Sequence, residues 1–227
     1  MRYSLDDHPA VFDALYAGKS YDEEVAFALE RVPGADRALV VGCRTGEQLL
    51  RFEAAGLDVL GSDPSPAMVE RARGKVEATV HIGALPDLPV EAEFNLVVAF
   101  GVVNRLAADE LEASLTALAD FVGEDGVLIL DAGTFPEMVA PALRTGSGSK
   151  GDCARLSQCS RIDDRRARVD ALVFHGESWF VERHTLTEFA HEEIAIALTD
   201  LGFVVKREDW DADPADMGDR SVFVARR

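Results

Sequence analysis

The sequence predicts an α/β fold: a doubly wound, mostly parallel seven-stranded sheet that ends in an antiparallel hairpin, with a small inserted antiparallel β layer. Short apolar runs without polar alternation, typical of strands buried on both faces, alternate with helical segments over the first 131 residues. Stretches of alternating polar and apolar residues follow, and apolar strands close the chain. Strand–helix alternation with short links requires right-handed crossovers, and therefore a doubly wound sheet.

Residues 1–34 are expected to form an N-terminal helical cap. Within it, a helix over residues 21–32 follows Ser20, a favourable N-cap residue, and stops before Pro33-Gly34. The strongest predicted strand is Phe-Asn-Leu-Val-Val-Ala-Phe at residues 94–100. The other parallel strands are expected at residues 38–41, 58–61, 78–82 and 126–131, and the helices at residues 47–55, 65–73 and 109–122, the last capped by Asp109.

The pattern changes after residue 131. Arg-Thr-Gly-Ser-Gly-Ser-Lys-Gly-Asp at residues 144–152 is expected to be a flexible loop at the start of an inserted antiparallel layer, residues 144–187. Its strands are expected near residues 153–162, 166–175 and 178–187, with a turn at Asp163-Asp164. A last helix over residues 188–201 precedes strands at 203–208 and 221–225, which an acidic loop joins. Residues 1–227 are interpreted as one domain.

The charge of the chain limits its partners. Its formal net charge is −18, and only four of its 23 basic residues are lysine. An acidic, lysine-poor surface repels phosphate backbones, which excludes nucleic acid as an expected partner. A protein from a cytosol at very high salt needs such a surface, because salt screens the mutual repulsion of its carboxylates. Halophilic adaptation is therefore predicted.

Neither a membrane segment nor a metal site is expected. Met1-Arg2-Tyr3-Ser4 has no apolar signal core and no long uncharged run follows, so we expect a soluble, cytoplasmic protein without a membrane partner. Cys43, Cys153 and Cys159 have no metal-ligand or redox spacing. They are interpreted as reduced, small apolar residues.

A glycine turn and an aspartate follow two neighbouring predicted strands. Leu-Val-Val-Gly-Cys-Arg-Thr-Gly at residues 39–46 is a strand that enters a glycine turn, and Ser62-Asp63-Pro64 ends the next strand. Such a turn lets a ligand approach the backbone, and a carboxylate at the second strand end accepts hydrogen bonds from a ribose diol. Together they predict a nucleoside-containing cofactor at the carboxyl ends of the sheet. The alternative is a tight turn followed by Asp63 as a helix N-cap, which needs no ligand.

With these parts in place, the chain resembles the class I S-adenosylmethionine-dependent methyltransferases, most closely the sugar N,N-dimethyltransferases that finish the amino sugars of macrolide antibiotics. The antiparallel ending also favours this family over a dinucleotide-binding Rossmann domain. The order and spacing of the matching stretches hold over nearly the whole chain. These stretches are Phe-Asp-Ala-Leu-Tyr-Ala-Gly-Lys-Ser-Tyr at 12–21, Val-Gly-Cys-Arg-Thr-Gly-Glu-Gln-Leu-Leu-Arg at 41–51, Gly-Ser-Asp-Pro-Ser-Pro-Ala-Met at 61–68, His-Ile-Gly-Ala-Leu-Pro-Asp-Leu at 81–88, Thr-Phe-Pro-Glu-Met at 134–138 and His-Thr-Leu-Thr-Glu-Phe at 184–189.

The resemblance implies S-adenosyl-L-methionine as the cofactor and assigns residues to it. The glycine loop would lie under the methionine part, Asp63 would hold the ribose hydroxyls, and Phe100 would lie beside the sulfonium. Pro64 and Leu85 would cover the two faces of the adenine. The implied cofactor-binding residues are Gly42, Cys43, Arg44, Gly46, Asp63, Pro64, Leu85 and Phe100. The implied acceptor-binding residues are Asn104 and Arg105 after the fourth strand, and Tyr3, which would close over the site.

The chain departs from the family pattern at several positions. Val40 replaces an acid, Arg44 a glycine and Ala84 an acid. Phe121 replaces the histidine of the sugar enzymes, and Gly133 and Thr134 replace their paired tryptophans. Without the first acid the cofactor ammonium loses a charge partner, at a cost of about 1–3 kcal/mol in a dry site. Arg44 either opposes the cationic cofactor or pairs with its carboxylate. Phe121 removes a candidate general base, commonly worth about 100- to 10,000-fold in rate, so no catalytic residue is assigned.

Two hypotheses remain open. The first is an S-adenosylmethionine-dependent methyltransferase that acts on a small-molecule acceptor, an amine or amino sugar, because a neutral amine held in line needs little acid–base help. The alternative is a catalytically inactive methyltransferase-like module for binding or dimerisation. An NAD-dependent oxidoreductase is disfavoured, since Gly-Cys-Arg-Thr-Gly lacks the Gly-x-Gly-x-x-Gly spacing. The open edge of the inserted layer also suggests a homodimer.

Overall fold

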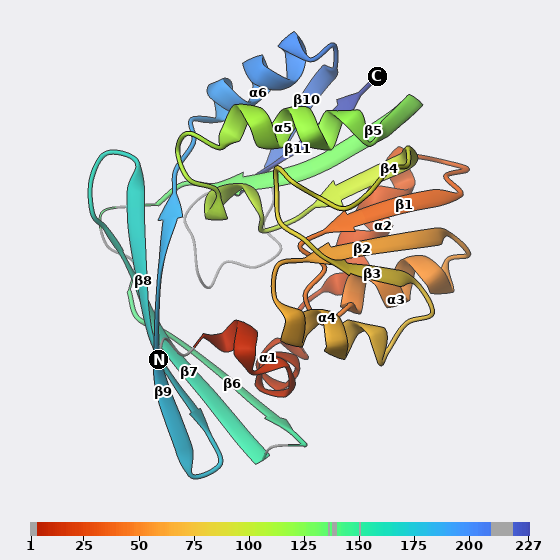
Figure 1. Ribbon diagram of the computed structural model, residues 1–227. Coiled ribbons are helices and arrows are strands. Elements are labelled where there is room, and N and C mark those ends of the chain that lie inside the picture. Colours follow the sequence, from red (N-terminus) through yellow and green to blue (C-terminus); the bar gives the residue numbers. More distant parts are fainter. Residues whose placement is uncertain (1–3, 136, 138–139, 150, 210–219) are drawn as a thin grey trace.

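The computed structural model describes residues 4–135, 137, 140–149, 151–209 and 220–227. The chain forms two sheets with helices around the larger one (Figure 1). Its strands are β1 (Arg37–Val41), β2 (Asp58–Asp63), β3 (Thr79–Ile82), β4 (Phe94–Ala99), β5 (Val122–Gly133), β6 (Ala142–Gly148), β7 (Gly151–Arg161), β8 (Arg166–His175), β9 (Ser178–Thr187), β10 (Val204–Asp209) and β11 (Arg220–Arg226). Its helices are the 3₁₀ helices η1 (Leu5–Asp7) and η2 (Val103–Arg105), together with α1 (Pro9–Tyr16), α2 (Tyr21–Arg31), α3 (Glu47–Ala54), α4 (Pro66–Arg73), α5 (Leu111–Asp120) and α6 (His191–Asp200).

The larger sheet has seven strands in the order β10-β11-β5-β4-β1-β2-β3. Strands β1 to β5 are parallel to their neighbours, whereas β11 pairs antiparallel with both β5 and β10. The predicted fold class, a mostly parallel sheet with an antiparallel ending, is therefore confirmed.

The larger sheet is buried on both faces, as the lack of alternation in its strands predicted. Along β1, Leu39 and Val41 belong to the core under α5 and α6, while Ala38 and Val40 belong to the core under α2, α3 and α4. All four side chains are at most 4% exposed. The carboxyl ends of the parallel strands therefore meet at one edge of a rigid layer, which is where a site can be positioned.

The second sheet has the order β6-β7-β8-β9 and stands apart from the larger one, next to α1 (Figure 1). The flexible loop expected at residues 144–152 is wrong: most of this stretch belongs to β6 and the start of β7, paired from Ala142–Ser157 to Gly148–Gly151. The small residues are needed for close packing rather than for flexibility. A Cβ atom on Gly146 would lie 1.9 Å from the carbonyl oxygen of Ala14 in α1.

The ends of several elements differ from the prediction. Helix α5 begins at Leu111 after Glu110, so Asp109 is not its N-cap, and the helix ends at Asp120 because β5 already begins at Val122. Helix α4 takes Ser65 as its N-cap, with the Ser65 hydroxyl accepting from the Met68 amide at 3.2 Å. The alternative that made Asp63 the helix cap is therefore wrong.

The three cysteines are buried, and none of them forms a disulfide. Burial raises the pKa of the Cys43 and Cys153 thiols, which keeps them in the uncharged form. None of the helices in the described part of the chain has the length and apolar character needed to cross a bilayer. Within the same residues, no group of three or more histidine, cysteine or acidic side chains is placed to hold a metal ion.

Candidate functional site

A cleft opens between the carboxyl ends of the parallel strands and the inner face of the four-stranded sheet. It contains about 1220 Å³ of empty space, part of it open to solvent, and η1, α1 and the start of α2 form its third side. Among the predicted site residues, those that line it are Gly42, Cys43, Arg44, Phe100, Asn104 and Arg105. Those that lie outside its lining are Gly46, Asp63, Pro64 and Leu85, and Tyr3 lies outside the described residues.

The loop from Gly42 to Gly46 has a left-handed backbone at alternate residues. The φ angles are +72° at Gly42, +50° at Arg44 and +85° at Gly46. A Cβ atom on Gly42 would lie 2.6 Å from the Val102 side chain, and one on Gly46 would lie 3.1 Å from the Ala72 side chain. Both glycines are thus required by conformation and packing, whether or not a ligand binds.

The Asp63 carboxylate fixes this loop. One oxygen accepts the backbone N–H of Arg44 at 2.9 Å and the other accepts that of Ser65 at 2.9 Å. Burial raises the pKa of Asp63, and the hydrogen bond from the Ser65 amide and the charge of Arg44 oppose that shift. Each carboxylate oxygen has a second lone pair, so Asp63 keeps acceptor capacity for a ribose hydroxyl.

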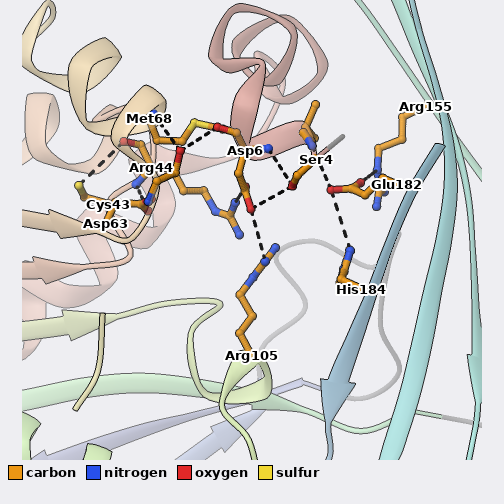
Figure 2. A network of polar contacts seen from close by, with 12 residues as sticks. Ser4, Asp6, Cys43, Arg44, Asp63, Met68, Arg105, Arg155, Glu182 and His184 are labelled. Carbon is orange, nitrogen blue, oxygen red and sulfur yellow. Dashed lines mark hydrogen bonds and ion pairs between the residues drawn. The ribbon is translucent and has the colours of Figure 1, made fainter. Parts of the chain in front are cut away.

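The side chains of Arg44 and Arg105 point toward the carboxylate of Asp6, one from the loop after β1 and the other from η2 (Figure 2). The Nη1 atom of Arg44 lies 3.3 Å from Asp6 Oδ1, and that of Arg105 lies 4.0 Å from Asp6 Oδ2. The Arg44 guanidinium also lies over the Phe12 ring, 5.2 Å from its centroid. The nearby charge of Arg44, followed by burial, lowers the pKa of Arg105.

Hydrogen bonds hold Asp6 and the preceding residue, Leu5, in place. The Ser65 hydroxyl donates to the Asp6 carbonyl oxygen at 2.8 Å, and the Asp6 amide donates to Ser4 Oγ at 3.2 Å. The next residue back, Leu5, donates its amide to Glu182 Oε1 at 3.2 Å. The 3₁₀ helix η1 thereby crosses the cleft from the larger sheet to the inserted layer.

The inserted layer presents charged side chains to the cleft. Arg155 Nε lies 3.4 Å from Glu182 Oε2, and His184 Nδ1 lies 4.0 Å from Glu182 Oε1 (Figure 2). Burial, together with the charge of Arg105, lowers the pKa of His184 to about 4, although Glu182 opposes this. The imidazole is therefore neutral near pH 7.

Sequence reasoning did not select Asp6, Arg155, Glu182 or His184 as site residues. Arg155, Glu182 and His184 lie on the strand face that also buries Cys153 and Phe180. Charged residues at inward positions of an alternating strand were the signal that would have found them, because such positions are normally apolar.

Asn104 lines the cleft, but its side-chain amide is bonded to the backbone. Its Nδ2 donates to the carbonyl oxygens of Gly133 at 3.0 Å and Thr187 at 2.8 Å, and its Oδ1 accepts the Gly133 amide at 2.7 Å. This residue therefore joins the loop after β4 to both ends of the inserted segment.

The departures from the family pattern lie away from the cleft, except at Arg44. Val40 is fully buried in the core with Leu49 and Val98, and Phe121 packs in the opposite core. Ala84 is exposed and does not line the cleft. Neither Val40 nor Phe121 therefore offers a position from which an acid or a base would reach a ligand in the present side-chain arrangement.

The lining fits the carboxylate of the implied cofactor, because Lys19 and Arg44 offer positive charge. The rings of Phe12, Tyr16 and Tyr21 already carry cations of the protein itself: Arg44 lies over Phe12, Arg144 over Tyr16 and Lys19 over Tyr21. Lys19 is already paired with Glu24 at 2.9 Å, so Arg44 is the more available of the two cations.

Comparisons with known proteins agree with this arrangement. The methyltransferase-domain family matches residues 38–126. A dTDP-4-amino-2,3,4,6-tetradeoxy-D-glucose N,N-dimethyltransferase of Saccharopolyspora spinosa is 27% identical over 211 residues, 86% of this chain and 85% of that protein. The crystal structure of Streptomyces venezuelae DesVI matches with a TM-score of 0.82 and 26% identity over 98% of this chain and 99% of that one. The S-adenosylmethionine-bound structure of an amino pentose methyltransferase from Micromonospora echinaspora, involved in calicheamicin biosynthesis, matches with a TM-score of 0.80 and 26% identity over 100% and 98% of the two chains.

Proposed function

The chain belongs to the class I S-adenosylmethionine-dependent methyltransferases, close to the amino-sugar N,N-dimethyltransferases, and from that premise we propose that it methylates the amino group of an amino sugar. The observation that supports this acceptor most directly is the cleft itself. One side is the loop after β1, and the other is the charged inner face of the inserted layer. A small polar acceptor is enclosed by such a site, whereas a macromolecule is not.

In this proposal the chain acts mainly by positioning. The cofactor supplies a methyl group on a sulfonium, which is already an excellent leaving group. Gly42 and Cys43 would line the methionine part, and Phe100 would lie beside the sulfonium. Asp63 would hold the ribose hydroxyls and Pro64 and Leu85 would flank the adenine, where the cofactor extends beyond the lining of the cleft. Holding donor and amine in line within a closed site is the main source of rate for such a transfer.

The acceptor amine must be neutral to attack. His184 faces the cleft as a neutral imidazole at pH 7, so it adds no positive charge that would repel a bound amine or the sulfonium. Phe121 packs among apolar residues of the core, and catalysis in this proposal does not depend on a general base at that position.

The alternative is a catalytically inactive module. Arg44 favours it, because its guanidinium occupies the loop where the resembled enzymes have glycine and is tied to Asp6 across the cleft. Under this alternative, the Arg44–Asp6 pair blocks the cofactor.

Calorimetric titration of S-adenosylmethionine and S-adenosylhomocysteine in multimolar KCl separates the two. Micromolar binding shows that Arg44 is accommodated; incubation with nucleotide-linked amino sugars should then add one or two methyl groups by mass spectrometry. No binding of either ligand to protein shown to be folded would contradict the proposed transfer.

We further propose a halophilic, cytoplasmic protein that binds neither nucleic acid nor membrane. The support is the net charge of −18 and the arginine-rich basic set. A gel-shift assay with duplex DNA and sedimentation with anionic vesicles, both at low salt, test the two excluded partners. Retention in either assay would contradict this part of the proposal.

A further inference from the structure

We propose that Arg44 and Arg105 form an oxyanion-binding subsite that takes a carboxylate or phosphate group between the cofactor loop and the inserted layer. Their guanidinium groups come from separate elements and converge on the single carboxylate of Asp6 (Figure 2). The inference rests on the proposed function only in taking the same cleft as the binding site of donor and acceptor.

The charges around the cleft leave these two arginines short of partners. Every other cation that lines it has a carboxylate of its own among the described residues: Lys19 with Glu24, Arg155 with Glu182, and Arg220 with Asp131. Arg44 and Arg105 share Asp6 alone. Asp63 also lies near Arg44 and their charges interact, but its two oxygens accept the backbone amides of Arg44 and Ser65 rather than the guanidinium. Within the described part of the chain, Arg44 and Arg105 therefore have one ion-paired carboxylate between them.

The contacts to Asp6 are also incomplete. Each guanidinium approaches the carboxylate through one nitrogen, at 3.3 Å and 4.0 Å, although a guanidinium has five N–H donors and bonds carboxylates best through two parallel hydrogen bonds. The charge of Arg44 also lowers the pKa of Arg105, as expected for two like charges that approach the same carboxylate. An anion placed between them would relieve this repulsion and use the spare donors.

The side chains are accessible for such a contact. Arg44 is 27% exposed and Arg105 is 42% exposed, and both line the cleft. In an acidic chain of net charge −18, two guanidinium groups directed into one cleft attract anions from solution. Two sources have this chemistry: the amino-acid carboxylate of the cofactor, and an anionic group of the acceptor.

Titrations of Arg44→Gln and Arg105→Gln test the subsite. The three probes are S-adenosylhomocysteine, 5′-methylthioadenosine, which lacks the amino-acid part, and inorganic pyrophosphate added to protein loaded with S-adenosylhomocysteine. Arg168→Gln is the matched control, because Arg168 is an exposed, paired arginine on the inserted layer that does not line the cleft. KCl is kept at the lowest concentration at which circular dichroism shows folded protein, since chloride competes for the same site.

We expect Arg44→Gln and Arg105→Gln each to bind at least one anionic probe ten-fold more weakly or worse. The affinities of the control, Arg168→Gln, should stay within two-fold of the wild type. Weaker pyrophosphate binding with an unchanged affinity for S-adenosylhomocysteine assigns the subsite to the acceptor. Weaker binding of S-adenosylhomocysteine with an unchanged affinity for 5′-methylthioadenosine assigns the subsite to the cofactor carboxylate. Unchanged affinities for all probes in both folded variants would overturn the subsite. A wild type that binds no S-adenosylhomocysteine would instead overturn the proposed function.

Discussion

Asn104 donates its side-chain amide to the carbonyl oxygen of Thr187 at 2.8 Å, and so ties the loop after β4 to the end of β9. The same amide nitrogen donates to the Gly133 carbonyl oxygen, and both bonds are buried. An aspartate at position 104 keeps the shape of the side chain but has no N–H to donate.

Asn104→Asp should therefore leave two buried carbonyl oxygens beside an unpaired carboxylate and destabilise the fold by about 3 kcal/mol. Thermal unfolding in constant KCl measures the loss. Asn95→Asp is the control, because the Asn95 side-chain oxygen only accepts, from the amides of Asp36 and Arg37. Equal melting temperatures for the two variants would show that the hydrogen bonds of the Asn104 side chain do not stabilise the fold.

Gly146→Ala should displace α1 from the inserted layer. The added methyl group would lie 1.9 Å from the Ala14 carbonyl oxygen, and backbone cannot move aside as a side chain does. Overpacking of this kind costs about 1–3 kcal/mol or more. Because Phe12 and Tyr16 of α1 line the cleft, affinity for S-adenosylhomocysteine should fall as well.

The matched change is Gly18→Ala, where an added Cβ meets no atom within 4 Å. It should leave both the melting temperature and the ligand affinity close to those of the wild type. A Gly146→Ala protein that is as stable as Gly18→Ala would contradict the close packing of α1 on β6.

The stability of the protein should depend on His184 in mild acid. Its folded pKa of about 4 lies below the ordinary value of 6.5, so the unfolded chain binds the proton more readily. The stabilisation is complete above pH 6.5 and is lost as the pH falls toward 4, by about 3 kcal/mol at most. His184→Gln should reduce this loss, whereas His81→Gln on β3 should not.

Nuclear magnetic resonance titration of labelled imidazoles gives a second check on the same group. Arg105→Gln should raise the pKa of His184, because the Arg105 charge is one of the causes that lower it. Glu182→Gln should lower it further, because the Glu182 carboxylate opposes the shift. No movement in either variant would contradict the proximity of the three side chains.

Val40→Asp should not restore an ammonium partner for the cofactor. The Val40 side chain is 0% exposed in the core with Leu49 and Val98, so the aspartate would be buried without a partner. We expect a loss of several kcal/mol in unfolding free energy. Arg44→Gly should fold, because glycine adopts the φ of +50° without strain. A stable Val40→Asp protein with tighter S-adenosylmethionine binding would contradict this.

The melting temperature should rise with KCl up to multimolar concentration. Salt screens repulsion among the 41 acidic residues that give the chain its net charge of −18. A potassium chloride series at constant pH measures the slope. A melting temperature that is independent of KCl would contradict the proposed halophilic adaptation.

The larger sheet could be predicted from the sequence because its pattern is local. Ala38 to Val41 is apolar without alternation, and the structure places alternate residues in two separate cores. The prediction failed at residues 144–152, where small polar residues indicated flexibility although their size reflects the approach of α1. A sequence pattern does not reveal which distant helix will lie against a strand.

The candidate site was only half predictable for a similar reason. Gly42, Arg44 and Arg105 follow strands of the parallel sheet, so their common edge followed from the topology. Asp6 and Glu182 come from opposite ends of the chain, and the bond from Leu5 to Glu182 spans 177 residues. Contacts of this kind depend on how η1 crosses the cleft, and the spacing of residues in the sequence does not predict that path.

The inserted layer leaves the larger sheet after Gly133 and returns at Thr187, and Asn104 bonds both residues. Both ends of the inserted segment are therefore fixed beside the cleft by the same side chain. We expect that a segment anchored in this way can change in length without altering the register of the parallel strands. Its packing is still coupled to the cleft, because Gly146 on β6 lies against α1, whose Phe12 and Tyr16 side chains line the cleft. A change in the inserted layer is therefore transmitted to the binding site through α1 and not through the larger sheet.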